Sequence, residues 1–104
     1  MPVRDEEAFL TVLNQLSKLL VQVDDKSFWR EEIHRYSMQN GEEVIQSCKI
    51  IAAWGGGMGS FLDLVLTPVN GHKMADKDYL TLNQQLDDLR EQLFKLANSI
   101  ASRC

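Results

Sequence analysis

The sequence predicts an all-α fold, a four-helix bundle-like single domain. Four segments carry apolar residues at helical spacing, and a cluster of glycines interrupts this pattern between the third segment and the fourth. The length of 104 residues suits one domain. We therefore expect residues 1–104 to form one helical domain, with a glycine-rich turn and a short ordered segment between the third and fourth helices.

The first predicted helix has the clearest core-facing side and ends at Asp24-Asp25. Acidic residues at positions 5–7 fall at its start, where the helix dipole favours negative charge. Its apolar residues recur at intervals of three and four, the period of one helix face: Phe9, Val12, Leu13, Leu16, Leu19, Leu20 and Val23.

The second and third predicted helices are shorter. Asp25 or Ser27 can cap the second, and Asn40-Gly41 is a stop signal before the third, which ends at the glycine cluster. The expected core-facing residues are Phe28, Trp29, Ile33 and Tyr36 in the second helix, and Val44, Ile45, Cys48, Ile51 and Ala52 in the third.

The fourth predicted helix is the longest, and Asp76 is its expected N-cap. Its apolar residues form an unbroken heptad seam: Leu82, Leu86, Leu89, Leu93, Leu96 and Ile100. In so short a chain this seam favours one helix of an antiparallel bundle. A homodimer that pairs through this helix is the alternative.

The segment before the fourth helix is open in type. Ser60 and Asp63 have the spacing of a capping box, which predicts a short helix, but residues 60–66 can equally form an extended piece. An exposed loop over residues 67–75 is expected to follow. Asn70-Gly71 is a hairpin signal, although its flanks are weak.

Four of the six glycines lie within residues 55–59. A phosphate-binding loop needs a lysine after the last glycine and a preceding strand, and the sequence offers neither. We interpret the cluster as a sharp turn that passes close to a neighbouring helix, with the Asp63 carboxylate accepting backbone N–H groups. A small enzyme or ligand-binding protein that uses residues 55–63 as its site is the alternative.

No set of residues predicts catalysis or metal binding. His34 and His72 are isolated and lack zinc-site spacing, and His34 is expected to face solvent. Cys48 lies in an apolar stripe, which is typical of a buried thiol, and a disulfide to Cys104 is not expected. Ser60 lacks the glycine and the strand of a nucleophile elbow. We therefore predict no enzyme, no metal and no cofactor.

The charge composition favours a protein partner. The net charge is −4 and the isoelectric point about 5.0, and no cluster of Lys and Arg predicts a nucleic-acid surface. A basic protein matches this sign. The sequence shows no signal peptide and no membrane-spanning apolar run, so we expect a cytoplasmic protein that does not enter a membrane.

Acidic residues are the candidate partner-binding residues. Those at the starts of helices are explained by the helix dipole, but Asp87 and Asp88, with Glu91, lie in mid-helix. These three are the first candidates. The second candidates are Glu31, Glu32, Glu42 and Glu43.

The glycine segment resembles a family motif. Its letters run Gly56-Gly57-Met58-Gly59-Ser60-Phe61-Leu62-Asp63-Leu64. This is similar to G-G-M-G-S-[FL]-N-D-[LV], the mark of a family of small, uncharacterised bacterial proteins, except that Leu62 stands where the motif has Asn. The likeness covers residues 54–97, since a helix led by an asparagine, here Asn83, follows in that family. The resemblance implies no activity. Members of this size often occur in toxin–immunity neighbourhoods, which implies an immunity protein that neutralises a basic toxin domain.

Overall fold

The computed structural model describes residues 2–40, 42–53 and 64–102. In these ranges the chain forms helices α1 (Pro2–Gln22), α2 (Phe28–Ser37), α3 (Glu42–Ala52) and α4 (Tyr79–Ala101), with short 3-10 turns η3 (Pro68–Asn70) and η4 (Asp76–Asp78). The described part contains no strand, so the all-α prediction is confirmed. The glycine motif lies outside the described residues, and with it the predictions for Gly56, Gly57, Met58, Gly59, Ser60 and Asp63.

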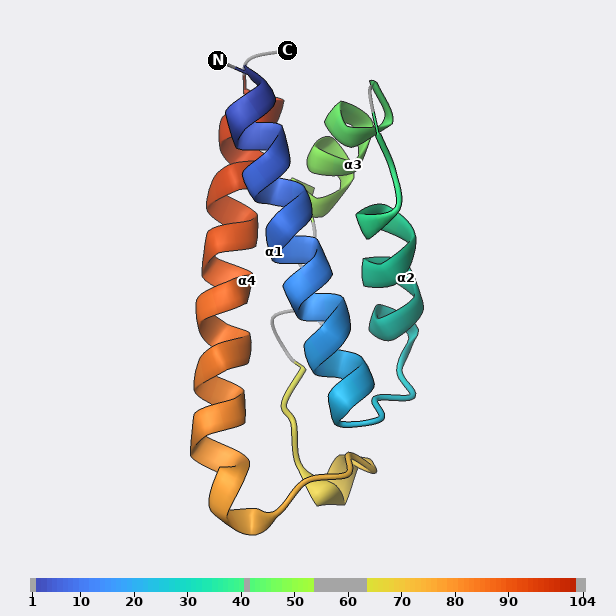
Figure 1. Cartoon of the computed structure of the whole chain (residues 1–104), viewed down its shortest axis with the longest axis vertical. Helices are drawn as coiled ribbons and strands as arrows, with labels where there is room; N and C mark the ends of the chain where they lie inside the picture. The colour runs from blue at the N-terminus through green and yellow to red at the C-terminus, as the bar shows by residue number, and fades with distance from the viewer. Residues whose placement is uncertain (1, 41, 54–63, 103–104) are drawn as a thin grey trace.

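Helix α1 occupies the middle of the bundle. It packs against α2 on one side and α4 on the other, and α3 packs against α4 (Figure 1). The start of α1 and the end of α4 lie at the same end of the molecule, so these two long helices are antiparallel (Figure 1). The turns η3 and η4 lie at the opposite end, which we call the turn end.

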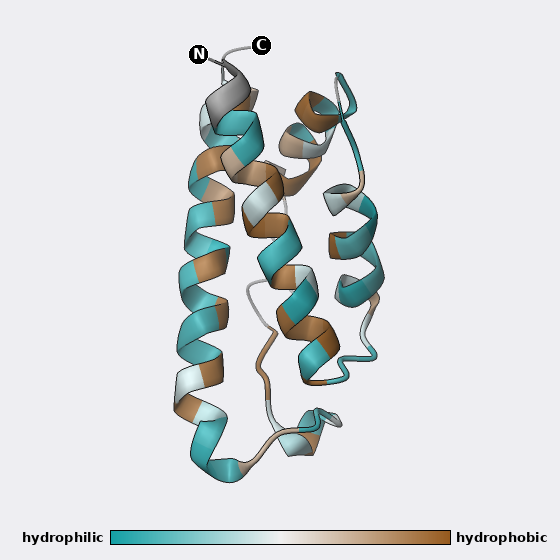
Figure 2. Cartoon of the chain, viewed as in Figure 1, coloured by the Kyte–Doolittle hydropathy of each residue, from teal (hydrophilic) through white to brown (hydrophobic). Residues whose placement is uncertain are grey.

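The predicted core residues face the interior. Apolar residues gather on the inner sides of the helices (Figure 2). All seven apolar residues predicted for α1 are buried, as are Val44, Cys48 and Ile51 of α3. In α4 the whole heptad seam is buried except Leu96, which is partly buried. The seam is therefore used within the chain, and a homodimer would have to form through another face unless the bundle opened.

Helix α2 differs from the prediction at both of its ends. Ile33 and Tyr36 are buried, but Phe28 is 63% exposed. Phe28 is the first residue of the helix, and its ring makes an edge contact with Trp29 at 5.1 Å between centroids. The helix ends at Ser37, before Asn40.

Helix α4 begins later than predicted. Asp76 does not cap it, because residues 76–78 form the turn η4 and the helix starts at Tyr79. Asp78 occupies the cap position, and its side chain makes no capping hydrogen bond. No helix in the described part is both long and apolar enough to cross a membrane.

The segment that precedes η3 is held against α4 by side chains. Residues 64–66 are not helical. The amide of Asn83 accepts a hydrogen bond from Leu66 N and donates one to Leu66 O, both at 2.8 Å. The Arg90 guanidinium donates to Leu64 O at 2.9 Å. Of the predicted segment 60–66, residues 64–66 are non-helical, and residues 60–63 lie outside the described residues.

The loop that follows is tighter than predicted. Asn70-Gly71 ends the turn η3 instead of forming a hairpin, and Gly71 has a φ of +88°, a conformation that favours glycine. Most residues between 67 and 75 are exposed or half-buried, but His72 is only 5% exposed. The prediction of an exposed loop is therefore wrong for His72.

Candidate functional site

The three mid-helix acids lie on the outward side of α4. Asp87, Asp88 and Glu91 are exposed, and the side chains of Asp87 and Glu91 are 59% and 67% accessible. Residues three or four apart are neighbours on a helix surface, so these carboxylates form one continuous surface. We call residues 87, 88 and 91 the acidic face.

Nearby cations neutralise the acidic face incompletely. Arg90 pairs with Asp87, but Arg90 is only 8% exposed and its guanidinium also holds Leu64 O. Lys95 pairs with Glu91 at 3.3 Å in a pair exposed to solvent, which contributes little stability. Asp88 accepts a hydrogen bond from the uncharged amide of Gln84 at 2.9 Å. Asp87 and Glu91 thus each have one cationic partner, and Asp88 has none among the described residues.

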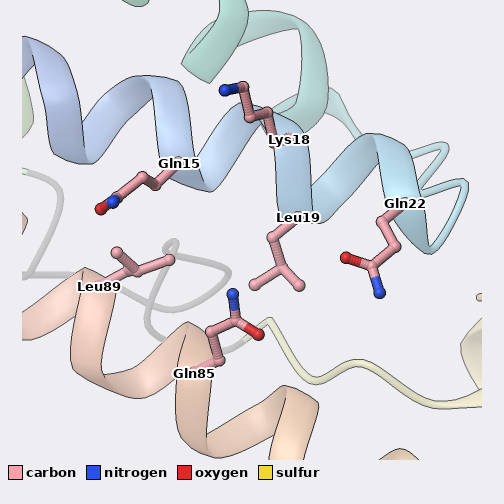
Figure 3. A pocket seen from close by; sticks show the side chains of 6 residues that line it. All are labelled: Gln15, Lys18, Leu19, Gln22, Gln85 and Leu89. Atoms are coloured by element: carbon pink, nitrogen blue, oxygen red, sulfur yellow. The ribbon is translucent and has the colours of Figure 1, made fainter.

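An open groove of about 240 Å³ lies between α1 and α4. Its floor consists of Leu19 and Leu89, which are 1% and 7% exposed. Glutamine side chains extend toward the facing helix, Gln15 and Gln22 from α1 and Gln85 from α4 (Figure 3). Lys18 also lines the groove, but its ammonium points away from α4 (Figure 3). We call this space the glutamine groove.

The glutamine groove and the acidic face are adjacent. Asp88 follows Gln85 by three residues on α4, and such residues are neighbours on a helix surface. The described residues provide no hydrogen-bond partner for the amides of Gln15, Gln22 and Gln85. Asp88 therefore borders the amides, whereas Asp87 lies about 160° around α4 from Gln85, given 3.6 residues per turn.

The second group of predicted acids does not join this surface. Glu31 and Glu32 are on α2, and Glu42 and Glu43 are on α3. Glu31, Glu42 and Glu43 lie in helix first turns, as the dipole explanation predicts. Glu32 forms an ion pair with Arg35 at 2.5 Å, and this hydrogen bond raises the pKa of Arg35.

Sequence reasoning missed a buried polar cluster at the turn end. Asp25 and His72 are buried side by side, with Asp25 Oδ1 2.6 Å from His72 Nε2. The other carboxylate oxygen of Asp25 accepts from Ser27 N at 3.2 Å and Ser27 Oγ at 2.5 Å. Ser27 Oγ in turn accepts from Trp29 N and so caps α2, as predicted. The residues of this cluster, Asp25, Ser27 and His72, line an open pocket of about 370 Å³.

The end of α1 directs Asp25 into this cluster. Asp25 N donates to Leu20 O at 2.9 Å and Asp24 N to Val21 O at 3.0 Å, which is the hydrogen-bond pattern of a Schellman motif. Asp24 occupies its left-handed position with a φ of +52°. Lys73 N donates to Val23 O at 2.8 Å and brings the η3 loop to the same place. The sequence could indicate only the contact between Asp25 and Ser27, which are two residues apart. It could not indicate the contact with His72, which is 47 residues from Asp25.

The cluster has the chemistry of a structural network. His72 Nδ1 lies 3.0 Å from Thr67 N and 3.2 Å from Thr67 O, and Nε2 lies 2.6 Å from Asp25 Oδ1. Both ring nitrogens are therefore engaged by neighbouring groups of the chain itself. The carboxylate also stands between the serine and the histidine, whereas in a catalytic triad the histidine stands between the other two.

Asp24 gives the fold a dependence on pH. A hydrogen bond from Lys73, followed by the charges of Lys73 and Lys26, lowers the pKa of Asp24 below its ordinary value of 3.8. Because the folded pKa is the lower one, the stabilisation is complete above pH 3.8 and is lost as pH falls through the folded pKa. We expect Asp24→Asn, which tolerates the same left-handed backbone, to be less stable than the parent at neutral pH and equal to it in strong acid. Urea unfolding across this range measures the difference, and a difference that stays constant with pH would contradict the prediction.

The remaining predicted residues lie apart from these sites. His34 is exposed as expected, with its Nδ1 3.5 Å from Ser17 Oγ. Cys48 is fully buried in the core, and Cys104 lies outside the described residues. No group of three or more metal-ligating side chains comes together in the described part of the chain.

Comparison with known proteins adds no relative. No family model, no curated protein and no solved structure matches the chain.

Proposed function

We propose that this chain is a small acidic protein-binding module, an immunity protein that binds a basic bacterial toxin in the cytoplasm and neutralises it. One observation carries the proposal. The acidic face exposes three carboxylates within residues 87–91, of which Asp87 pairs with the buried Arg90 and Asp88 has no cationic partner among the described residues. A surface of this kind attracts a basic partner and speeds its association.

Two further features support the proposal. The net charge of −4 gives the whole chain the sign that a basic partner requires. The resemblance of the glycine segment to the bacterial family motif supplies the toxin–immunity context, which charge alone does not specify.

Charge reversal on α4 tests the proposal. We expect Asp87→Lys with Asp88→Lys to slow association with the protein encoded by the adjacent gene about tenfold or more at low salt, because acidic groups at an interface act mainly on the association rate. The loss should shrink as salt rises and screens the charges. Stopped-flow or surface-based kinetics at several salt concentrations measures both effects.

The matched control changes the same number of charges elsewhere. Glu42→Lys with Glu43→Lys alters the net charge equally, but on the first turn of α3. It should reduce the rate much less if the acidic face makes the contact. Equal losses in the two double variants would show that only net charge matters, and no binding between the two unmodified proteins at micromolar concentration would sink the immunity proposal.

A further inference from the structure

The three amides of the glutamine groove share one chemical property. Each carries a carbonyl acceptor and an N–H donor. These groups can pair with the N–H and the C=O of a peptide group. Gln15, Gln22 and Gln85 have no hydrogen-bond partner among the described residues, and they extend into the same space above Leu19 and Leu89 (Figure 3). The groove thus offers polar pairing at its rim and apolar contact at its floor.

Helix α4 already binds main chain in this way within the molecule. The Asn83 amide pairs with both the N–H and the C=O of Leu66, at 2.8 Å each. Leu66 is not in a helix, and its side chain is fully buried beside the paired main chain. Asn83 is therefore an example, within this chain, of a side-chain amide on α4 that pairs with the main chain of a non-helical segment. Gln85, two residues later, faces α1 in the glutamine groove (Figure 3).

We propose that the glutamine groove binds a non-helical segment of a basic protein partner through its main chain. The amides of Gln22 and Gln85 pair with its peptide groups, and Leu19 and Leu89 contact its apolar side chains. Lysine or arginine side chains on the same segment reach Asp88, which borders the groove. The basic character of the partner rests on the proposed function; the main-chain pairing rests on the amides.

The size and openness of the groove favour a chain segment over a small molecule. Small-molecule pockets usually enclose about 300–1,000 Å³ and cover most of their ligand. The groove holds about 240 Å³ and is open to solvent along one side. A segment laid across it can extend beyond both ends, whereas a small ligand would remain largely uncovered.

The test separates main-chain recognition from charge. The full chain, labelled with ¹⁵N, is titrated with a decalysine peptide and, separately, with spermine, a polyamine that has no peptide groups. We expect the side-chain amide resonances of Gln22 and Gln85 to shift with the peptide and not with spermine. Resonances around Asp88 should shift with both.

Three variants complete the test. Gln22→Met and Gln85→Met keep side-chain length and helix propensity but remove the pairing, and each should weaken decalysine binding about two- to tenfold. Gln46→Met, an exposed position on α3, should leave it unchanged. Unshifted glutamine resonances, equal shifts with spermine, or Met variants that bind like the parent would each overturn the inference.

These outcomes are distinct from the test of function. A peptide that shifts only the resonances around the acidic face would remove the groove proposal and leave the charge-based proposal standing. Shifted glutamine resonances, together with no binding to the protein of the adjacent gene, would support the groove and remove the immunity proposal.

Discussion

His72→Leu is expected to lower the free energy of unfolding by about 3 kcal/mol, because a buried carboxylate that loses its hydrogen-bond donor keeps its desolvation cost without compensation. The substitution replaces the imidazole with an apolar side chain of similar bulk and leaves the Asp25 carboxylate buried without its partner at 2.6 Å. A loss of this size is a large share of the roughly 5–15 kcal/mol that stabilises a domain. Urea denaturation followed by circular dichroism measures it.

Two further variants make the result specific. His34→Leu removes the other histidine, which is exposed on α2, and should change stability by no more than about 0.5 kcal/mol. Asp25→Ala combined with His72→Leu removes both partners and should cost clearly less than the sum of the two single losses. Additive losses would mean that Asp25 and His72 are not coupled, and the structural role given to the cluster would be wrong.

Leu86→Ala is expected to cost about 2–5 kcal/mol, because it removes a fully buried leucine from the α4 seam and leaves a cavity. Leu80→Ala, on the same helix, is the matched control. Leu80 is 77% exposed, so its truncation should stay within about 0.5 kcal/mol. Chemical denaturation of the three proteins gives both values.

The same experiment distinguishes the bundle from a dimer built on the seam. If the leucines of α4 pack within the chain, the denaturation midpoint does not depend on protein concentration. A midpoint that rises with concentration, and a Leu86→Ala effect that appears only at high concentration, would show that the seam joins two chains.

The sequence predicted the elements whose stability comes from a repeated pattern. The spacing of leucines in α1 and α4 alone identifies the buried faces, because a helix of period 3.6 has only one way to bury such a stripe. The burial of Val44, Cys48 and Ile51 in α3 follows from the same reasoning. The acidic face was also predictable, since Asp87 and Asp88 are not explained by a helix terminus.

Features that depend on contacts distant in sequence could not be predicted. His72 is buried because the Schellman turn of α1 aims Asp25 at a loop 47 residues later. Asn83 holds Leu66 across 17 residues, and no periodic signal marks such a pair. The predicted start of α4 was wrong because residues 76–78 form a separate turn, so that Asp76 lies three residues before the first residue of the helix. The glutamine groove was missed because exposed glutamines on two helices carry no spacing signal.

The central claim is that the acidic face of α4, together with the glutamine groove that Asp88 borders, binds a basic protein. The most direct measurement is an amide resonance map of the ¹⁵N-labelled chain, recorded with and without the unlabelled protein of the adjacent gene. We expect the largest changes at residues 15–22 and 84–92, with little change across α2 and α3. Changes concentrated on α2, α3 or the turn end, with residues 84–92 unaffected, would contradict the claim.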